Sequence, residues 1–223
     1  MIKAVLIDVD DTLLRWDDSA YAAIEAMFKK YGYPFCSDMM KVYNEISTPL
    51  WKKVENMEMT GDELRKIRWK LILDHLKIDG DPDALTRDYP LFLQKQWPLV
   101  EGAEKLVEYL SSKYILCAAT NAPKGQQTPR LEGAGLLKHF DFVFESSDVG
   151  YDKPNLQFYE YCLKKAGNLK PDEVIMIGDS LAADVSGGKK AGLKTCFYNP
   201  NKKEDTVGAD YNVSSLQDIM DIL

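Results

Sequence analysis

Three aspartates follow an apolar segment at the start of the chain. Residues 2–7 predict a buried strand of an α/β sheet, and Asp8, Asp10 and Asp11 come directly after it. Ligands bind at the carboxyl edge of such sheets, and strand alternation puts Asp8 and Asp10 on the same side. A bound cation would relieve the repulsion between the carboxylates and leave one of them free to react. A solvated acidic loop is the alternative interpretation.

Two further segments place polar groups after apolar runs or before helices. The apolar segment 114–119 ends in Thr120 and Asn121, whose hydroxyl and amide can donate hydrogen bonds to phosphate oxygens. Lys153 and Pro154 precede a predicted helix over 156–165. Pro154 suits the first turn of that helix, which would place the Lys153 ammonium near an anion-attracting helix N-terminus. Taken singly, a polar turn and an exposed lysine explain these segments equally well.

A fourth segment repeats the pattern of the first. The apolar strand predicted over 174–177 ends in Gly178 and Asp179, and Asp184 follows near the start of the next helix. Gly178 allows a tight turn, and Asp179 is placed to bind a hard cation through oxygen. Asp184 is expected to cap the helix, bind metal or orient a ligand indirectly. Four such segments in this order, each at a predicted strand end or loop, form a strong combined signal.

These segments resemble the four motifs of the haloacid dehalogenase (HAD) superfamily of phosphohydrolases, over essentially the whole chain. The matches are Asp8-Val9-Asp10-Asp11-Thr12, Thr120, Lys153-Pro154, and Gly178-Asp179 through Asp184. The resemblance implies Mg²⁺ as cofactor, with Asp8, Asp10 (through its backbone carbonyl) and Asp179 as ligands. It also implies Asp8 as nucleophile and Asp10 as general acid and base. Thr120, Asn121 and Lys153 would hold the phosphoryl group, with Thr12 and Asp184 in support.

A narrower resemblance concerns the substrate. Several segments are similar to the pyrimidine-leaning nucleoside 5′-monophosphate phosphatases of this superfamily: Thr48-Pro49-Leu50-Trp51, Asn121, Lys153-Pro154-Asn155, Gly187-Gly188 and Ala191-Gly192-Leu193. This resemblance implies a small phosphomonoester as the binding partner. Trp51 is then a candidate for stacking on the nucleoside base, although packing within its own region is the commoner role of a large aromatic residue.

Other functions remain open on the sequence alone. A phosphatase or mutase acting on a sugar phosphate or phosphoglycolate would use the same motifs. A haloacid dehalogenase needs neither metal nor a protonated leaving group, so Asp10 and Asp179 argue against it. A non-enzymatic receiver-like module also clusters acids, a hydroxyl and a lysine at strand ends, but the long insertion after Leu14 argues against that interpretation.

The elements that position these residues predict an α/β fold. From Gly102 onward helices and strands alternate, which indicates a parallel, doubly wound sheet with right-handed crossovers. The expected helices are 103–111, 130–134, 156–166 and 183–191, and the expected strands are 114–119, 142–144, 174–177 and 195–198. Residues 1–15 and 98–223 are predicted to form the core domain, and 16–97 an inserted helical cap domain.

Helical spacing defines two candidate buried faces in the cap. One consists of Ala20, Ile24, Met27 and Phe28, and the other of Leu64, Ile67, Leu71 and His75. Helix starts are predicted near Thr60 and at the turn over 80–82.

Composition limits the class of protein. The 223 residues carry 28 Lys and Arg against 35 Asp and Glu, and a net charge of −7 argues against a broad nucleic-acid surface. The four cysteines have no paired short spacing, and Cys117 and Cys196 fall inside predicted apolar strands, so we expect buried free thiols there rather than disulfides or zinc ligands. We expect no membrane span and no secretory segment, and therefore a cytoplasmic enzyme, with the oligomeric state open.

Overall fold

A six-stranded parallel sheet forms the centre of the molecule. The computed structural model describes residues 1–223, and the strand order is β3-β2-β1-β4-β5-β6. The strands are β1 (Ala4–Ile7), β2 (Ile115–Thr120), β3 (Phe142–Glu145), β4 (Val174–Gly178), β5 (Lys194–Tyr198) and β6 (Tyr211–Val213). The predicted α/β class with a doubly wound parallel sheet is confirmed, and central strands such as β1 and β4 are apolar because they are buried on both faces.

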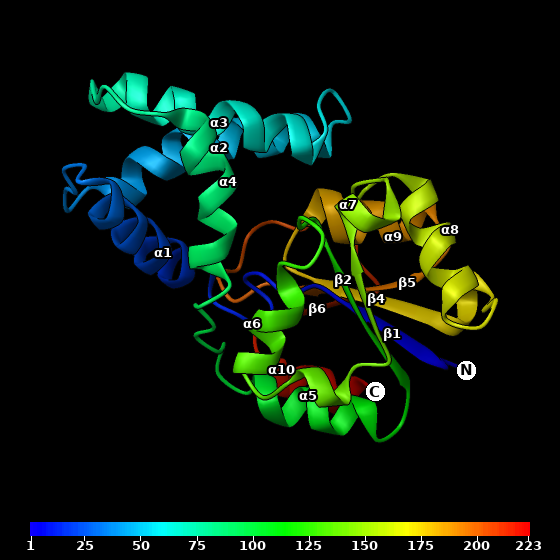
Figure 1. The fold of residues 1–223 in the computed structure, drawn as a ribbon. Coiled ribbons are helices and arrows are strands. Elements are labelled where there is room, and N and C mark those ends of the chain that lie inside the picture. Colours follow the sequence, from blue (N-terminus) through cyan, green and yellow to red (C-terminus); the bar gives the residue numbers. More distant parts are fainter.

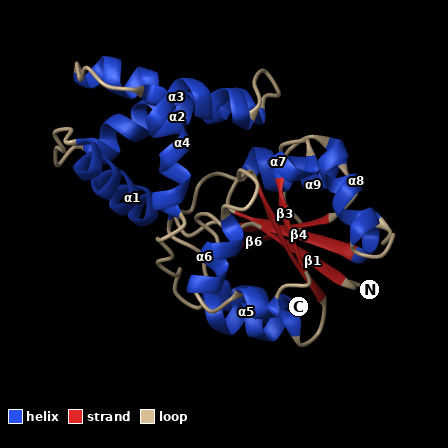
Figure 2. Ribbon diagram, viewed as in Figure 1, coloured by secondary structure: helices blue, strands red, loops and turns tan.

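Helices cover both faces of this sheet (Figures 1 and 2). On one face lie α5 (Ala103–Ser111), α6 (Gln127–Gly133), the 3₁₀ turn η1 (Leu137–His139) and α10 (Leu216–Ile222). On the other lie α7 (Ser146–Val149), α8 (Leu156–Lys165), the π-turn η3 (Leu181–Ser186) and α9 (Gly187–Lys190), with the short η2 (Pro171–Glu173) preceding β4. Alternate strand residues supply two apolar clusters, one under each helical layer.

Four helices lie outside the sheet, in the segment between β1 and α5. They are α1 (Trp16–Tyr31), α2 (Met39–Glu55), α3 (Gly61–Leu76) and α4 (Pro82–Leu93), at the upper left of Figure 1. The Thr60 hydroxyl caps α3 and Glu63 completes a capping box, while Asp81 caps α4 ahead of Pro82. Both predicted helix starts are therefore confirmed.

The four-helix segment has an apolar interior of its own. Its buried residues include the predicted α1 face of Ala20, Ile24, Met27 and Phe28, and no apolar cluster contains buried residues from both this segment and the sheet. We call residues 16–97 the cap region and residues 1–15 with 98–223 the core region. We propose that these regions are the two domains of the chain.

One predicted face in the cap region is only partly right. In α3, Leu64 is buried as predicted, but Ile67 and Leu71 are exposed at 37% and 41%. The buried face continues instead through Arg68, Trp69, Ile72 and Leu73. The charged residue at position 68 interrupts the apolar pattern on the true inner face, which is why spacing of apolar residues selected the wrong side.

Two predictions near the motifs also differ from the structure. Pro154 does not lie in the first turn of α8, because the helix begins after Asn155, whose side chain caps it by accepting from the Gln157 backbone N–H. The predicted helix over 183–191 begins earlier, as the π-turn η3, and continues as α9. The strand β6 and the helix α10 had no counterpart in the sequence-based prediction.

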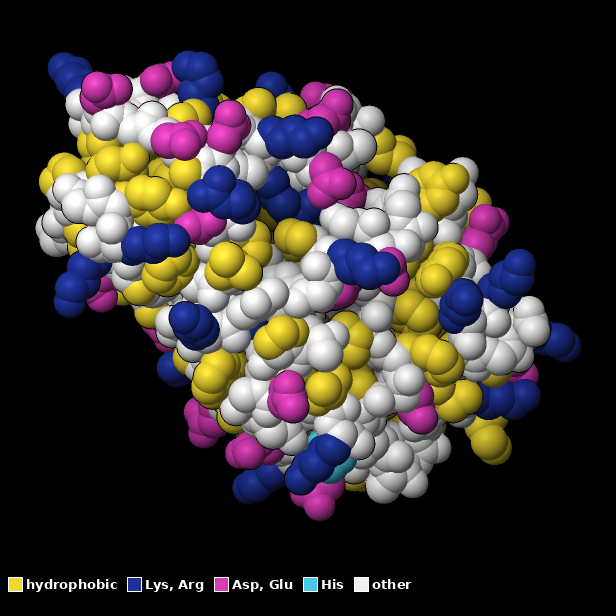
Figure 3. Space-filling view, in the orientation of Figure 1, with side chains coloured by type: hydrophobic (Ala, Val, Ile, Leu, Met, Phe, Trp, Pro, Cys, Tyr) yellow, Lys and Arg dark blue, Asp and Glu magenta, His cyan; other side chains and the backbone are white.

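Several other expectations concern the surface and the thiols. Cys117, Cys162 and Cys196 are free and buried, and burial raises the pKa of Cys117 and of Cys196 to about 12. None of the helices combines the length and hydropathy needed to cross a membrane. On the face shown in Figure 3, Lys and Arg side chains are interspersed with Asp and Glu.

Candidate active site

The strand register brings the predicted motifs to one edge of the sheet. Ile7, the last residue of β1, pairs with Ala118 of β2 on one side and with Ile177 of β4 on the other. All three strands are parallel, so the residues that follow them leave the sheet at the same edge. Asp8, the loop after β2 and Asp179 therefore become neighbours although they come from distant parts of the chain.

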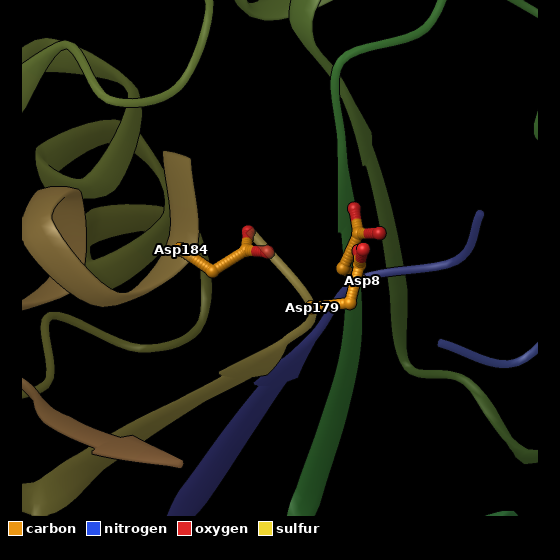
Figure 4. A group of neighbouring side chains, drawn as sticks. All are labelled: Asp8, Asp179 and Asp184. Carbon is orange, nitrogen blue, oxygen red and sulfur yellow. The ribbon is translucent and has the colours of Figure 1, made fainter. Parts of the chain in front are cut away.

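Three carboxylates meet at this edge (Figure 4). Asp8, Asp179 and Asp184 each offer one oxygen, and these three atoms lie within 4.8 Å of one another. Figure 4 shows Asp8 and Asp179 projecting in the same direction, with Asp184 reaching toward them from η3. The carboxylate of Asp179 makes no hydrogen bond with the protein, and that of Asp8 makes only one, with a lysine. A group of oxygen ligands with open positions suits a hard divalent cation.

Burial and mutual repulsion oppose the charged forms of these groups. Burial raises the pKa of Asp8 to about 7, against the lowering effect of Lys153, and the charge of Asp184 adds to the rise. Burial and the charges of Asp8 and Asp184 also raise the pKa of Asp179 well above its ordinary value. A positive charge placed among these carboxylates would remove this penalty.

Lys153 is the buried cation of the site. Its ammonium donates to Asp8 Oδ1, to Asp184 Oδ1 and to the Ala119 carbonyl, each at 2.7 Å. Burial alone would lower the pKa of Lys153, but the charges of Asp184 and Asp8 outweigh it and raise the pKa above its usual value. The three N–H donors of Lys153 therefore point toward two carboxylates and a carbonyl, and not toward the N-terminus of α8.

Asp184 holds this arrangement together through both of its oxygens. One accepts from Lys153 and the other from the Ser180 backbone N–H at 3.0 Å. The carboxyl group packs so closely on Gly178 that a Cβ there would lie 2.1 Å from Asp184 Oδ2. Close packing, rather than the tight turn predicted from sequence, explains the glycine. Of the roles considered for Asp184, indirect orientation of the site fits these contacts best.

The loop after β2 places Thr120 and Asn121 beside Lys153. The Asn121 side chain accepts from the Lys153 backbone N–H at 2.8 Å and donates to the Lys153 carbonyl at 2.9 Å, so it fixes the segment that carries the ammonium. Thr120 is buried and accepts from Gln127 at 3.3 Å. Thr12 is buried beneath the Asp8 loop, and its hydroxyl has no hydrogen-bond partner. Phosphate contacts by Thr120 and Asn121 stay predictions.

Sequence reasoning missed two residues that hold Asp10. Arg130 Nη1 donates to Asp10 Oδ1 at 2.5 Å, and Gln127 Nε2 donates to Asp10 Oδ2 at 2.7 Å. Arg130 also donates to the Gln127 side chain at 2.8 Å, and both residues are fully buried. The available signal was a polar pair three positions apart in a helix that follows a motif strand, since such residues share a helix face.

A cavity of about 480 Å³ opens above the carboxylates and extends into the cap region. Its core side includes Asp8, Asp10, Thr120, Lys153 and Asp179, and its cap side includes Tyr43, Ser47, Trp51, Arg65, Arg68, Trp69 and Tyr89. Trp51 is half-buried and the Arg65 guanidinium lies 6.0 Å from its ring centre. The structure therefore brings every predicted site residue except Thr12 to the lining of a single cavity.

Hydrogen bonds join the two regions around this cavity. The Gly61 backbone N–H donates to Asp152 at 2.7 Å, and Arg65 donates to the Asn121 carbonyl at 3.0 Å. Ser180 Oγ, next to Asp179, donates to Glu55 of α2 at 2.8 Å. The cap region thus contacts the motif loops directly.

Comparisons with known proteins agree with this geometry. The family model described as haloacid dehalogenase-like hydrolase matches residues 2–192. The HAD-hydrolase YfnB of Bacillus subtilis is 31% identical over 99% of this chain and 95% of its own. A crystal structure of YfnB bound to magnesium, in which interdomain movement is described, superposes with a TM-score of 0.92 over 99% of this chain and 98% of that one.

Two curated relatives carry an activity in their names. The pyrimidine 5′-nucleotidase PynA of Streptococcus pneumoniae is 34% identical over 99% of this chain and 94% of its own. The pyrimidine 5′-nucleotidase YjjG of Escherichia coli is 29% identical over 98% of this chain and 96% of its own.

Proposed function

Because the chain belongs to the haloacid dehalogenase-like hydrolase family, we propose that it is a magnesium-dependent phosphomonoester hydrolase with a nucleoside 5′-monophosphate as substrate. The observation that carries the proposal is the shared cavity. It joins Asp8, Asp179 and Lys153 at the sheet edge to aromatic side chains of the cap region. Such a cavity has room for a phosphoryl group at one end and a nucleoside at the other.

Asp8 and Asp179, with the backbone carbonyl of Asp10, are the proposed ligands of Mg²⁺. The fit rests on the unpaired carboxylate of Asp179, the open oxygen of Asp8 and a ligand set made only of oxygen. Bound Mg²⁺ would supply charge neutralisation for the carboxylates and the phosphoryl oxygens. Asp184 stays with Lys153 and the Ser180 backbone N–H, so we assign it a supporting role.

The proposed reaction has two halves. In the first, an Asp8 oxygen attacks phosphorus, the bond from phosphorus to the ester oxygen breaks, and Asp10 protonates the departing alcohol. In the second, Asp10 takes a proton from water, which attacks the aspartyl phosphate and releases inorganic phosphate with Asp8 restored. Thr120 and Lys153 are the proposed partners of the phosphoryl oxygens, and Lys153 must exchange its present acceptor, Asp8 Oδ1, for a phosphoryl oxygen to take this role. Arg130 and Gln127 fix the direction of the Asp10 carboxyl group.

The nucleotide assignment rests on the relatives PynA and YjjG and on the size and lining of the cavity. A phosphatase or mutase of sugar phosphates, or a phosphoglycolate phosphatase, would use the same core residues. The relatives named pyrimidine 5′-nucleotidase favour the nucleotide, and we take it as the substrate class.

A panel of phosphomonoesters tests the proposal. Purified protein with Mg²⁺ is assayed for phosphate release from pyrimidine and purine nucleoside 5′-monophosphates, ribose 5-phosphate, other sugar phosphates and phosphoglycolate. We expect the highest kcat/KM with a nucleoside 5′-monophosphate. A higher kcat/KM for a sugar phosphate or phosphoglycolate would contradict the nucleotide assignment. If no ester released phosphate, the proposed phosphatase activity itself would be contradicted.

A further inference from the structure

Three polar atoms in the cap region are buried without a hydrogen-bond partner: Ser47 Oγ, Arg68 Nε and Tyr89 Oη. Their residues are only 3%, 4% and 3% exposed, and all three line the cavity above the carboxylates. A buried polar group without a partner is destabilising, because it has lost its hydrogen bonds to water without replacement. Three of them in one lining are candidates to pair with a molecule bound in the cavity.

Arg68 lacks a counter-ion as well. It takes part in none of the ion pairs of the protein, and its one hydrogen bond runs from Nη1 to Tyr43 Oη at 2.6 Å. Aromatic rings surround the guanidinium, with centres 5.0 Å away for Tyr43 and Tyr89 and 5.5 Å for Trp69. These rings offset part of the cost of burying the charge, but they accept nothing from Nε in the plane of the guanidinium.

We propose that Ser47, Arg68 and Tyr89 form a subsite that donates hydrogen bonds to a carbonyl oxygen of a pyrimidine base. This assignment rests on the proposed nucleotidase function and adds the feature of the substrate that is recognised. Arginine only donates, so its partner must be an acceptor, and the two hydroxyl groups can donate to the same oxygen or to a neighbouring acceptor. Every common pyrimidine nucleotide carries a ring carbonyl, as guanine does, whereas adenine has none, and the relatives named pyrimidine 5′-nucleotidase favour the pyrimidine.

Size and shape favour a base over a small acid. A carboxylate such as that of phosphoglycolate would also satisfy Arg68, but a two-carbon acid would leave most of the 480 Å³ cavity unfilled. The aromatic walls, to which Tyr43, Trp69 and Tyr89 contribute, present flat apolar faces beside the donors. A flat ring with oxygen acceptors at its edge matches both properties.

The test compares two substrates that share a leaving group. Uridine 5′-monophosphate and ribose 5-phosphate both lose phosphate from a ribose 5-hydroxyl, but only the first has a base. We expect Tyr89→Phe and Ser47→Ala to lower kcat/KM for the nucleotide about tenfold, and Arg68→Met about a hundredfold, with ribose 5-phosphate changed less than about twofold. Phosphoglycolate and adenosine 5′-monophosphate are assayed alongside.

Thermal unfolding gives a second, independent readout. Because Ser47 Oγ and Tyr89 Oη are unpaired in the free protein, Tyr89→Phe and Ser47→Ala should leave the Tm unchanged or raised. Arg68→Met also removes the hydrogen bond to Tyr43, so this variant is judged by its kinetics alone. The matched control is Tyr31→Phe, which removes a cap hydroxyl that donates to Asp88 at 2.7 Å outside the cavity. The control should lower the Tm and leave both substrates unaffected.

The outcomes distinguish a failure of the proposed subsite from a failure of the proposed enzymatic function. Selective loss of nucleotide hydrolysis at unchanged Tm supports the subsite. Equal loss on both substrates, no loss on either, or a fall in the Tm of Tyr89→Phe and Ser47→Ala matching that of Tyr31→Phe would overturn it while nucleotide hydrolysis by the wild type stands. Failure of the wild type to hydrolyse nucleotides would overturn the proposed function itself. If Arg68→Met lost only phosphoglycolate hydrolysis, the donors would be assigned to a carboxylate, and the base would be overturned as the recognised group.

Discussion

The core region and the cap region differ in how their buried cations are partnered. In the core region Lys153 is buried with all three of its donors in use, between two carboxylates and a carbonyl. In the cap region Arg68 is also buried, with no carboxylate and with an unpaired Nε. The protein itself supplies three acceptors to the ammonium of Lys153, while Arg68 Nε has no acceptor in the protein and is part of the proposed base subsite.

This difference separates the residues proposed to carry out the reaction from the residues proposed to select the substrate. The groups that every phosphomonoester needs are held in place before the substrate arrives, as electrostatic stabilisation of phosphoryl transfer requires. The groups that we propose to distinguish one ester from another lie in the cap region. Changes in the core region should therefore impair substrates with the same leaving group alike, and changes in the cap region should impair them selectively.

The largest effect is expected at Asp8. Asp8→Asn keeps the shape but removes the attacking oxygen's charge, so hydrolysis of every ester should fall at least about a thousandfold. The assay is phosphate release from a nucleotide and from an aryl phosphate. The same substitution at exposed Asp172, at the opposite end of β4, should change neither rate. Substantial activity of Asp8→Asn would show that another group attacks phosphorus.

Removal of the metal should be nearly as damaging. With Asp8 and Asp179 as ligands, excess chelator should abolish turnover of all substrates, and added Mg²⁺ should restore it. Ca²⁺ should restore little, because its larger and looser coordination sphere disturbs the in-line geometry. Rates are measured before and after readdition of each cation. Full activity in excess chelator would contradict the metal site and reopen the dehalogenase alternative.

A change at Asp10 should be smaller and should depend on the leaving group. Asp10→Asn is expected to slow cleavage of an alkyl ester by about a hundredfold or more and that of an aryl ester by less, because a good leaving group needs little protonation. Gln127→Met removes a donor that aims Asp10 and should show the same dependence more weakly. Single-turnover phosphorylation rates measure the effect. An equal loss across leaving groups would contradict Asp10 as general acid.

Trp51 provides the test of selectivity outside the donor subsite. If its ring stacks on the base, Trp51→Ala should reduce nucleotide kcat/KM by about tenfold or more, with a small aryl phosphate less affected, because stacking contributes roughly 1–3 kcal/mol per base in single-strand binders. Parallel loss on both substrates together with a lower Tm would identify Trp51 as a packing residue of the cap region.

The smallest effect concerns the cap region's own stability. Hydrogen bonds from Lys30, Tyr31 and Arg87 hold the pKa of Asp88 well below its ordinary value. The stabilisation is therefore fully present at neutral pH and is lost progressively as the pH falls below about 4, the pKa of an unfolded aspartate. Asp88→Asn should lower the free energy of unfolding at pH 7, and the difference from the wild type should shrink steadily in acid, with turnover at neutral pH unchanged. A difference independent of pH would contradict the charge-based role.

The core region was well predicted from the sequence because its signals are local. An apolar run that ends in aspartate marks both a strand and its carboxyl edge, so strand pattern alone is enough to place Asp8 and Asp179 together. The strand pattern does not predict which residues contact Asp10, because Gln127 and Arg130 lie 117 and 120 residues away along the chain. Their helix also begins at Gln127 rather than at Arg130, which hid their common face.

The cap region was less predictable. Amphipathic spacing predicted the buried face of α1, but in α3 it selected Ile67 and Leu71, which are exposed. The inner face of α3 carries Arg68, and a buried charge cannot be distinguished from a solvated one by spacing alone. Buried charges are rare because they are costly, so the place where the pattern failed is also the place where a function is expected.

The hydrogen bonds between the regions have a consequence for the turnover cycle. Separating two apolar surfaces costs free energy in proportion to the area exposed, whereas water replaces a polar contact at little net cost. No apolar cluster crosses this boundary. Each turnover must let an alcohol and then inorganic phosphate depart, and such openings often limit the rate of enzymes with lids. Polar contacts such as Gly61–Asp152, Arg65–Asn121 and Ser180–Glu55 are ones that water can replace when the regions separate and that can form again afterwards.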